Sequence, residues 1–484
     1  MRSLFLDVFS TCHFFIKVIF CYTITNMANV IPDQVLKVYK TLEENNFAAY
    51  FVGGSVRDLI LKRKVKDWDL NTNATPEQIL KVFPKGFYDN TFGTVGIPTK
   101  IGKEEYIIEV TTYRTETGYK DRRHPDKVSW GKTLEEDLSR RDFTINAIAL
   151  KVSEKNVFEL IDLYGGEEDL RKKIIRAVGD PNLRFKEDAL RLLRAVRIAT
   201  ELEFAIEKKT WEKIIEDSAL IKYISAERIK TELLKILASD HPYEGVLLLQ
   251  DCGLLGFILP ELLEGIGVSM VRPGRHHTTD VFTHNVLSLK FCPSKDPIVR
   301  FATLLHDIGK PKVAAKDEEG YVIFHNHEVA GGRIAEKICD RLKFSRKEKE
   351  KIIMLIRWHM FSVNENQTDA AIRRFIRKIG VDNVKDMMDL RVADRLGGGT
   401  QTAESWRLKL FKEKIEEQLM PAPFSINEMA VDGNDVMRIL KIEPGPVIGK
   451  ILNGLFAEVD EDLSRNNRAY LEKRIRELGK NLVK

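Results

Sequence analysis

Apolar residues near the start of the chain change from helical to strand spacing within a few dozen positions. Between residues 30 and 46 they recur every three or four positions, which predicts an amphipathic helix with a buried face of Val35, Leu36, Val38, Tyr39 and Leu42. The apolar run Ala49–Val52 predicts a strand that ends at Gly53-Gly54-Ser55, and a second helix is predicted to begin near Val56. A strand, a glycine turn and a helix N-terminus in this order present backbone N–H groups to a phosphate.

Strand-like segments continue through the first third of the chain and then give way to helices. Alternating or β-rich runs occur at Trp68–Leu70, Gly93–Ile97 and Tyr106–Thr112. Beyond about residue 180, long runs with helical periodicity are separated by short Gly/Pro breaks. The pattern predicts an α+β protein in which a small mixed α/β head precedes an elongated all-α body.

Length and composition indicate a protein of several domains. The chain has 484 residues, 43% of them hydrophobic and 31% charged, and a net charge of +5, so any basic surface must be local. Five cysteines without close pairing or a CxxC motif favour a reducing, cytoplasmic environment. No uninterrupted apolar run has transmembrane length, so we expect no membrane contact.

The first 26 residues differ from the rest of the chain. They are rich in Phe, Ile, Val and Cys and hold one acidic residue, Asp7. A signal or transit peptide is one interpretation, although Lys17 splits the apolar stretch and no small-residue cleavage site follows. We favour translation from Met27, where ordinary globular sequence begins. Residues 1–27 would then be an extension, either untranslated or targeting.

Asp67 and Asp69 flank Trp68 in the first strand-like segment after the glycine turn. Residues two apart on a strand face the same side, so the two carboxylates are expected to converge. Convergent carboxylates make an oxygen-rich Mg²⁺ site, and two Mg²⁺ ions can activate an attacking hydroxyl and neutralise a leaving pyrophosphate. Alone, an Asp-x-Asp is more often solvated surface, and the glycine turn upstream is what favours a site.

Three motifs together carry a specific resemblance, namely Gly53-Gly54-Ser55-Val56-Arg57-Asp58, Asp67-Trp68-Asp69 and Arg140-Arg141-Asp142-Phe143-Thr144-Ile145-Asn146-Ala147. They resemble the DNA polymerase beta nucleotidyltransferase superfamily, and within it the bacterial-type (class II) tRNA nucleotidyltransferase (CCA-adding enzyme) and poly(A) polymerase family. The resemblance covers roughly residues 28–480. It implies a DNA polymerase beta-like head, Mg²⁺ as cofactor, and tRNA, CTP and ATP as partners, and it leaves the oligomeric state open.

The resemblance also implies roles for residues of the head. Asp67, Asp69 and Glu109 are the catalytic carboxylates, and Asp67 and Asp69 are Mg²⁺ ligands. Glu109 lies in a strand-like run whose Ile108 and Val110 would face the opposite, buried side. The implied nucleotide-binding residues are Gly53, Gly54, Ser55, Arg57, Arg141, Asp142, Asn146, Asp188, Arg191 and Arg194.

Residues 184–197 read as one helix, on which Glu187 and Arg191 share a face. C and A both offer an amino donor beside a ring-nitrogen acceptor, whereas G and U offer a carbonyl beside an N–H. A carboxylate and an arginine can therefore admit C or A and reject G and U. The resemblance implies this base-selecting role for Asp188 and Arg191, with Glu187 orienting Arg191. An ordinary surface ion-pair helix is the alternative.

Two further features bear on which member of the family this is. Family members use a mobile loop to switch from C to A, and the corresponding segment Arg114–Asp126 is basic and holds Gly118. Its presence favours a CCA-adding over a CC-adding enzyme. Ala189 after Glu187-Asp188, where a proline is typical of poly(A) polymerases, leans away from that activity. Candidate RNA contacts are Lys343–Lys351 and Arg373-Arg374-x-x-Arg377-Lys378, although charge runs are more often solvated faces.

Histidines gather in the second half of the chain, with seven of ten lying at positions 276, 277, 284, 306, 325, 327 and 359. The pattern resembles the HD phosphohydrolase superfamily, which implies a second divalent metal, of open identity, held by His284, His306, Asp307, His327, His359 and Asp394. Imidazole and carboxylate ligands suit Mg²⁺, Mn²⁺, Ni²⁺ or Fe, and such a metal can activate water against a phosphoester. Family members with this domain can show phosphatase or 2′,3′-cyclic phosphodiesterase activity.

The expected domains are a nucleotidyltransferase head at 28–175, a nucleotide-selecting neck and helical RNA-binding region at 176–265, an HD domain at 266–400 and a helical tail at 401–484. The implied function is template-independent addition of CCA to the 3′ end of tRNA by two-metal nucleotidyl transfer, with a metal-dependent phosphohydrolase in the HD domain. The alternatives are a poly(A) polymerase or A-only adding enzyme, a non-catalytic tRNA-binding protein, and a signalling HD phosphohydrolase with a regulatory head.

Overall fold

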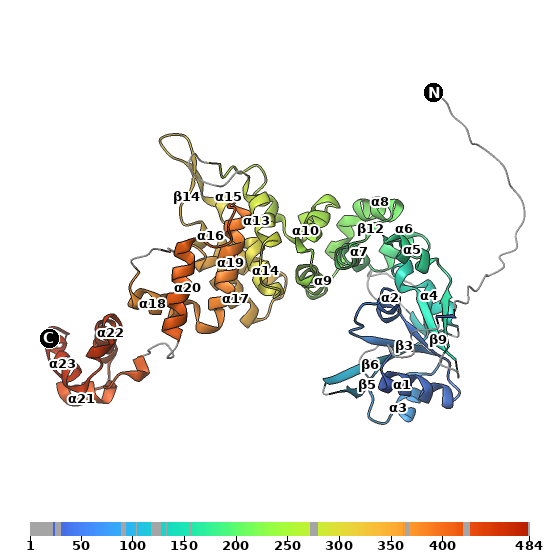
Figure 1. Ribbon diagram of the computed structural model, residues 1–484, viewed down its shortest axis with the longest axis horizontal. Coiled ribbons are helices and arrows are strands. Elements are labelled where there is room, and N and C mark those ends of the chain that lie inside the picture. The colour runs from blue at the N-terminus through green and yellow to red at the C-terminus, as the bar shows by residue number, and fades with distance from the viewer. Residues whose placement is uncertain are drawn as a thin grey trace, which may run out of the picture. The chain divides into compact units, whose positions relative to one another are not determined.

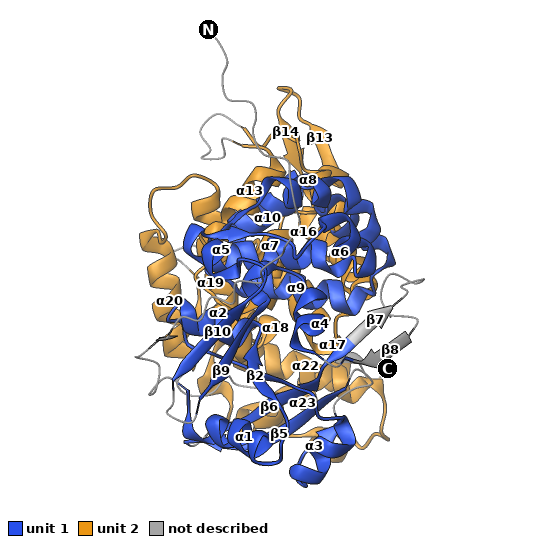
Figure 2. Cartoon of the chain, turned by 90° about the vertical axis from the view of Figure 1, so that its right-hand side faces the viewer, with its two compact units in different colours: residues 1–258 blue, residues 259–484 orange. Residues whose placement is uncertain are grey.

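The structure is a computed structural model that describes residues 23–24, 31–88, 93–102, 104–117, 127–131, 133–153, 157–271, 279–361, 363, 367–419 and 426–482 (Figure 1). Apart from Thr23–Ile24, the predicted N-terminal extension lies outside these residues, as do residues 118–126 of the predicted loop and His276 and His277. The chain forms two compact units, residues 1–258 and 259–484 (Figure 2).

The first unit contains a mixed sheet, and the second is mainly helical, which confirms the predicted α+β class. The strands run in the order β1 (Thr23–Ile24), β10 (Phe158–Asp162), β9 (Ile148–Val152), β2 (Ala49–Val52), β3 (Trp68–Thr72), β6 (Glu104–Thr112), β5 (Thr94–Ile101) and β4 (Phe87–Tyr88). β3 and β6 are parallel, and the other neighbouring pairs are antiparallel. All three strand-like segments of the sequence therefore lie in this sheet.

Helices α1 (Asp33–Glu44), α2 (Gly54–Ile60) and α3 (Pro76–Val82) pack on the strands of this sheet. The Tyr39 ring of α1 stacks on Phe51 of β2 with 5.3 Å between centroids, and Phe51 meets the edge of Trp68. The Tyr39 hydroxyl also donates to the Val152 carbonyl and accepts from the Val152 N–H. This buried aromatic core fixes β2 and β3, whose ends carry the glycine turn and the aspartates.

The remainder of the first unit is mostly helical. Its helices are α4 (Leu134–Ser139), η1 (Thr144–Asn146), α5 (Gly166–Lys172), α6 (Pro181–Glu187), α7 (Leu190–Leu202), α8 (Lys208–Asp217), η2 (Ser218–Tyr223), α9 (Ala226–Ala238), α10 (Pro242–Asp251) and α11 (Leu255–Ile258). Two small sheets pair β7 (Arg114–Thr117) with β8 (Lys127–Trp130) and β11 (Ile174–Ile175) with β12 (Ala205–Ile206). The prediction of one helix over residues 184–197 is wrong, because Asp188 is extended (φ −139°, ψ 104°) and separates α6 from α7.

The second unit begins with a helical bundle. Its elements are α12 (Pro260–Leu263), α13 (Val281–Lys290), α14 (Pro297–Leu305), α15 (Lys310–Val313), β13 (Ala314–Lys316), β14 (Val322–Phe324), α16 (His327–Arg341), α17 (Arg346–Trp358), α18 (Asp369–Ile379), η3 (Val381–Asn383) and α19 (Val384–Gly397). Helices α13 and α19 approach closely at Gly397, where a Cβ would overlap Ser288. This close approach brings Asp394 of α19 near His284 of α13.

The end of the chain adds α20 (Trp406–Leu419), η4 (Ile426–Glu428), α21 (Gly433–Leu440), α22 (Pro446–Glu461), η5 (Leu463–Arg465) and α23 (Arg468–Leu482). Helices α21 to α23 share a small core that includes Val436, Ile451, Leu455 and Leu471. Across the described residues, no helix combines the length and the apolar character needed to cross a membrane. The division into four domains stays a prediction.

Candidate active sites

Asp69 on β3 and Glu109 on β6 are direct register partners in the parallel strand pair. Asp67, immediately before β3, is exposed, and with Asp69 it lines a cavity of about 400 Å³ in the first unit. Loss of hydration and the neighbouring Glu109 charge raise the pKa of Asp69 to about 7, against the opposing effect of Arg141. The fold thus brings the three predicted carboxylates to the adjacent central strands β3 and β6, and they form a donor set suited to Mg²⁺.

The glycine turn approaches the same carboxylates. Gly53 has φ +73°, and a Cβ there would lie 3.0 Å from the Arg141 Nη1 and 3.4 Å from the Asp69 Oδ2. Only glycine combines this left-handed backbone with the available space. Gly54 and Ser55 begin α2 and line the cavity, but the Ser55 hydroxyl donates to the Val52 carbonyl at 2.7 Å. The Ser55 hydroxyl is therefore used within the turn. The predicted contact of Ser55 with nucleotide would then come from its backbone.

The third motif is joined to the turn by a chain of polar contacts. Arg57 Nη1 donates to Asn146 Oδ1 at 2.9 Å, and Asn146 Nδ2 donates to Asp142 Oδ1 at 3.1 Å. Asp142 in turn accepts from Arg194 Nε of α7 at 2.8 Å. Burial acts to raise the pKa of Asp142, but Arg194 and the Asn146 bond outweigh it and hold the pKa well below its ordinary value. Four predicted nucleotide-binding residues thus form one network.

Asp137 on α4 is a residue of this site that the sequence did not reveal. Its side chain is fully buried, and it accepts from Arg140 Nε at 3.0 Å and from Arg141 Nη2 at 3.1 Å. Asn71 of β3 donates to the same carboxylate. Burial acts to raise the pKa of Asp137, yet the two guanidinium groups lower it below its usual range. Asp137 therefore positions Arg141 beside the strand that carries Asp69.

The predicted base-selecting residues lie where α6 meets α7. Arg191 Nη1 is 2.8 Å from Glu187 Oε2, as expected from their spacing, and Arg191 Nη2 donates to the Arg140 carbonyl at 2.7 Å. Asp188 accepts from the Leu190 N–H and forms an ion pair of 2.7 Å with Arg228 of α9. Arg228 lies 40 positions further along the chain, and nothing local in the sequence singles it out.

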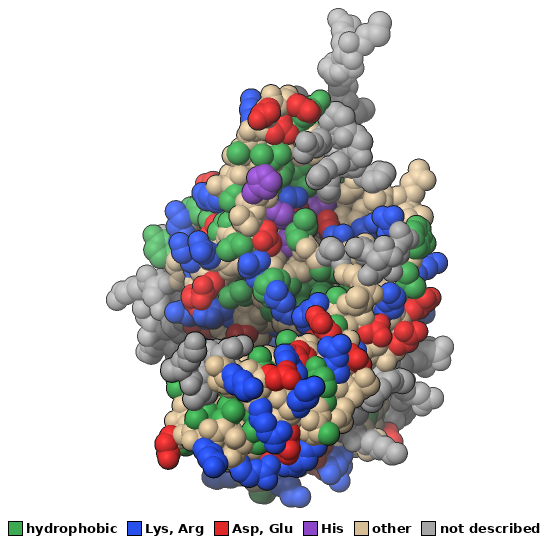
Figure 3. Space-filling model, turned by 90° about the vertical axis from the view of Figure 1, so that its left-hand side faces the viewer, with side chains coloured by type: hydrophobic (Ala, Val, Ile, Leu, Met, Phe, Trp, Pro, Cys, Tyr) green, Lys and Arg blue, Asp and Glu red, His purple; other side chains and the backbone are tan. Residues whose placement is uncertain are grey.

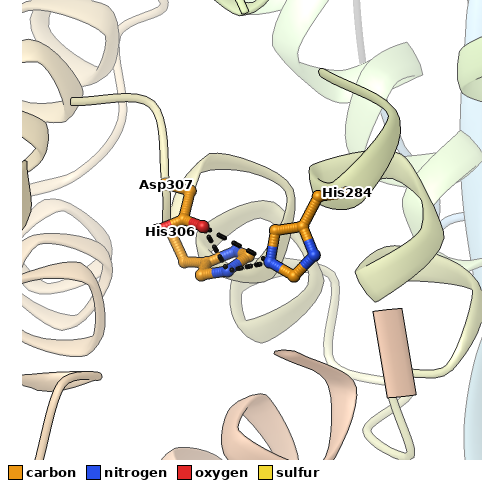
Figure 4. Close-up of side chains that lie close together, drawn as sticks. All are labelled: His284, His306 and Asp307. Carbon is orange, nitrogen blue, oxygen red and sulfur yellow. Dashed lines mark hydrogen bonds and ion pairs between the residues drawn. The ribbon is translucent and has the colours of Figure 1, made fainter. Parts of the chain in front are cut away.

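The predicted ligands of the second metal converge from five segments of the second unit. His284 Nε2 lies 3.1 Å from His306 Nε2 and 3.3 Å from Asp307 Oδ2 (Figure 4). The same nitrogen lies 3.3 Å from Asp394 Oδ1. On the other side, His327 Nε2 is 3.2 Å from Asp307 Oδ1 and 3.4 Å from His359 Nε2. All six predicted ligands are thus in one cluster.

Backbone carbonyls orient three of the four imidazoles. The Nδ1 atoms of His306, His327 and His359 lie 2.7–2.9 Å from the carbonyls of residues 303, 324 and 356. Each ring therefore donates with Nδ1 and directs the lone pair of Nε2 to the centre, as metal-ligating histidines do. Despite burial, Lys310 and the surrounding histidines hold the pKa of Asp307 well below the ordinary value, and His284 and His306 do the same for the pKa of Asp394, so both stay ionised. The donor set fits a divalent cation.

A cavity of about 330 Å³ opens beside this cluster, and histidine side chains are visible on one face of the second unit (Figure 3). Besides four of the predicted ligands, its lining includes His325, Lys310 and Arg391. Lys310 forms an ion pair with Asp307, and Arg391 pairs with Asp394 at 3.1 Å. The two cations were not among the predicted site residues, and they suit a phosphate oxygen beside a metal.

The basic runs predicted to contact RNA are partly occupied by ion pairs. In the first run, Lys349 pairs with Asp340, and Lys351 pairs with Asp296 and Asp386. These half-buried, paired side chains fit the alternative of an ordinary ion-paired face, and RNA contact there stays a prediction.

Three family models match the chain: the poly A polymerase head domain over residues 49–176, the probable RNA and SrmB-binding site of polymerase A over 203–265, and the HD domain over 286–398. The CCA-adding enzyme of Limosilactobacillus reuteri is 32% identical over 450 residues, which cover 92% of this chain and 96% of that enzyme. The chain belongs to the tRNA nucleotidyltransferase family. The motif-based resemblance is thereby confirmed.

Other relatives of this nucleotidyltransferase match parts of it, and one solved structure matches nearly all of it. The CCA-adding enzyme of Lactobacillus helveticus is 46% identical over 228 residues, which cover 46% of this chain and 55% of that enzyme, so the match spans about half of its length. The A-adding tRNA nucleotidyltransferase of Deinococcus radiodurans is 35% identical over 343 residues, which cover 68% of this chain and 76% of that enzyme. The crystal structure of the Bacillus stearothermophilus CCA-adding enzyme in complex with CTP superposes with a TM-score of 0.67 at 26% identity, covering 93% and 98% of the two chains.

Proposed function

We propose that this nucleotidyltransferase adds CCA to the 3′ end of tRNA from CTP and ATP without a nucleic-acid template. The observation that carries the proposal is the in-register pair of Asp69 and Glu109, which lies against the Gly53 turn beside an open cavity. The names of the relatives support CCA or A addition. The pairing of Asp69 with Glu109 beside the Gly53 turn argues against a non-catalytic tRNA-binding protein.

In this proposal the three carboxylates, Asp67, Asp69 and Glu109, hold Mg²⁺ in the first unit. The bound ions would activate the 3′-hydroxyl of the tRNA and neutralise the leaving pyrophosphate. The chain itself supplies the surroundings. The Gly53–Gly54 backbone and Arg57 would bind phosphate, and Asp142 and Asn146 would bind the ribose. Asp188 and Arg191 supply the acceptor and donor that suit C and A.

The test is an addition assay with tRNA that lacks its CCA end. Addition of two C residues from CTP, followed by one A that requires the CC end, is the expected result. A single A on tRNA already ending in CC, or a long A tail, would instead identify an A-adding enzyme or a poly(A) polymerase. Asp67→Ala and Asp69→Ala should each abolish addition without changing hydrolysis in the second unit.

We further propose that the HD cluster is a metal-dependent phosphoesterase. The Nε2 lone pairs around Asp307 supply a divalent-metal site, and Lys310 and Arg391 at the adjoining cavity suit the charge of a phosphoester. The bound metal would supply a nucleophilic water. The expected result is metal-dependent hydrolysis of bis(p-nitrophenyl) phosphate and of an RNA 2′,3′-cyclic phosphate, which His306→Ala abolishes while CCA addition persists. A purified protein that hydrolyses neither with Mg²⁺, Mn²⁺, Ni²⁺ or Fe²⁺ would contradict the proposal.

The environment of the protein is part of the proposal. Cys252, Cys292 and Cys339 are buried free thiols, which supports a reducing, cytoplasmic location. Fractionation of cells that express a tagged full-length chain tests this location.

A further inference from the structure

Helix α18 carries four basic residues whose surroundings divide them into two pairs. Arg373 and Arg377 point to Asp460 of α22, with Arg373 Nε 3.1 Å from Oδ1 and Arg377 Nη2 2.6 Å from Oδ2. Asp460 and Arg373 are buried. Arg373 and Arg377 therefore join α18 to α22 and are not available to RNA. Arg374 and Lys378 are exposed and line a separate cavity.

That cavity has a volume of about 420 Å³ and is lined by aromatic and basic side chains together. Trp358, Phe361 and Phe375 supply apolar rings, and Phe361 and Phe375 lie 4.9 Å apart. The Lys378 Nζ is 3.4 Å from the centroid of the Trp358 ring, and the Arg357 guanidinium is 4.6 Å from it. Cations held over an aromatic ring keep their charge and attract an anion.

The charge of the cavity is unbalanced. Its lining includes three cations and one carboxylate, and that carboxylate, Glu328, is taken by Arg357 at 3.2 Å. Within the part of the chain that the structure describes, no ion pair involves Arg374 or Lys378. A ligand that complements the lining must combine a flat apolar group with negative charge. A nucleotide does so, since its base stacks on aromatic rings and its phosphate pairs with the cations.

The aromatic cavity adjoins the cavity of the HD centre. Met360, which is 58% exposed, lines both. Arg391 lines the HD cavity, and its guanidinium lies 5.5 Å from the centroid of the Phe361 ring in the aromatic cavity. A nucleotide bound in the aromatic cavity would therefore lie next to a phosphoester bound at the histidine cluster.

We propose that the cavity around Trp358, Phe375, Arg374 and Lys378 binds one nucleotide of single-stranded RNA and holds the adjoining phosphoester at the HD centre. The second half of this statement rests on the proposed phosphoesterase function, and the first half does not. The cavity makes the HD centre selective for RNA over small phosphoesters, because only RNA fills both cavities.

Binding is tested on the full-length protein in the presence of a chelator, where neither addition nor hydrolysis takes place. The probe is a fluorescent pentaribonucleotide with one 4-thiouridine, which forms crosslinks on irradiation. The expected crosslink is to the segment that holds Trp358, Phe361 or Phe375, and Lys378→Ala and Arg374→Ala should each weaken binding roughly five- to tenfold. Lys385→Ala, an exposed lysine of α19, is the matched control. Crosslinks confined to other segments, or unchanged affinity in both variants, would overturn the proposal.

Hydrolysis assays distinguish loss of RNA binding in the aromatic cavity, the proposed subsite, from damage to the HD centre. Trp358→Leu and Lys378→Ala should raise KM for an oligoribonucleotide 2′,3′-cyclic phosphate about tenfold and leave kcat/KM for bis(p-nitrophenyl) phosphate unchanged. Equal losses for both substrates would mean that the variants damage the HD centre, and the subsite proposal would be wrong. If neither substrate is cleaved by the unmodified protein, the phosphoesterase proposal fails, and the crosslink still decides whether the cavity binds RNA.

Discussion

Arg228 of α9 donates to both carboxylate oxygens of Asp188, with Nη2 2.7 Å from Oδ2 and Nη1 3.3 Å from Oδ1. Asp188 is extended and sits in the break between α6 and α7, where helix geometry does not fix it. Arg228 therefore fixes the direction of the carboxylate proposed to accept from the amino group of C or A.

Replacing Arg228 should weaken nucleotide selection more than it weakens folding. Hydrogen bonds to charged groups contribute about 1.5–3 kcal/mol, so Arg228→Ala should lower kcat/KM for CTP by roughly ten- to hundredfold. The kcat/KM for UTP should fall less, because U does not use the same acceptor. The ratio of kcat/KM for CTP to that for UTP should therefore become smaller. Single-turnover addition with each nucleotide measures both.

The matched control is Arg171→Ala, which removes an exposed arginine paired with Glu168 on α5. It should leave both rates unchanged. Arg228→Lys should restore part of the CTP rate, because it keeps one charged donor. Equal losses for CTP and UTP in Arg228→Ala would show that Arg228 supports the fold and not the choice of base.

Asp142, which is buried, and Arg194, whose side chain is 33% exposed, form an ion pair. Arg194→Ala leaves the ionised Asp142 buried without its main partner, and breaking such a pair costs about 3–5 kcal/mol. The expected result is a Tm lower by on the order of 10 °C for the transition of the first unit. Adding Asp142→Asn to Arg194→Ala should recover stability, since it removes the unpaired charge, and a double-mutant cycle measures this coupling.

The depressed pKa of Asp142 also fixes the sign of the pH effect. In the unmodified protein its contribution to stability is present above the unfolded pKa of about 4 and is lost as the pH falls through the lower folded value. Arg194→Ala should remove most of this acid sensitivity. If Arg194→Ala is as stable as the unmodified protein and loses stability over the same range of acidic pH, the pairing of Asp142 with Arg194 is contradicted.

Local sequence patterns sufficed for the elements that carry the site. The spacing of apolar residues predicted α1, β2 and β3, and alternation around Glu109 predicted a strand, which in the structure pairs with the strand of Asp69. The histidine cluster was predictable because residues of rare type recur in a known pattern, and tertiary packing then brought all six ligands together.

The rest depended on contacts between distant segments. Asp137 looks like one more acidic residue of a helix N-terminus, and only its burial beneath Arg140 and Arg141 reveals its role. The break at Asp188 was missed because the charged spacing of residues 184–197 fits a continuous helix equally well. The division of the α18 arginines between Asp460 and a cavity also depends on packing, which a charge run does not encode.

Protonation of Asp69 should compete with Mg²⁺. Its pKa of about 7 means that the metal-free site is protonated below neutral pH, and binding must then release a proton. The apparent affinity should fall by up to about tenfold per pH unit below pH 7 and level off above pH 8. Calorimetric titration with Mg²⁺ between pH 5.5 and 8.5 measures this affinity. The titration uses the Asp307→Asn variant, in which binding at the HD centre is removed. A flat profile would show that Asp69 is ionised throughout.

Asp460 should be essential for joining α18 to α22. Asp460→Asn removes the charge shared by Arg373 and Arg377 and leaves a buried arginine without its partner, at a cost of about 3–5 kcal/mol. Calorimetry should show a lower transition for the second unit, and proteolysis within residues 426–482 should become faster. Asp462→Asn, at an exposed site two residues away, is the control and should change neither.

Removal of metal from the HD centre should make the stability of the second unit depend on pH between 6.5 and 9. Burial opposes the charge on His284, but its bonds to Asp307 and Asp394 prevail and raise its pKa to about 9. A folded pKa above the unfolded value of about 6.5 stabilises the chelated protein below pH 6.5, by about 3 kcal/mol on this shift, and the gain is lost as pH rises through 9.

Loading with a divalent metal should reverse that dependence, because the ion displaces the proton from His284 and binds more tightly as pH rises. Thermal unfolding at pH 6.5 and pH 9, with chelator and with metal, measures both slopes. His284→Asn should reduce the slope of the chelated protein, since this proton-binding group is gone, and His327, whose pKa Asp307 also raises, should account for the slope that remains. An unchanged slope in this variant would assign the proton to another member of the cluster.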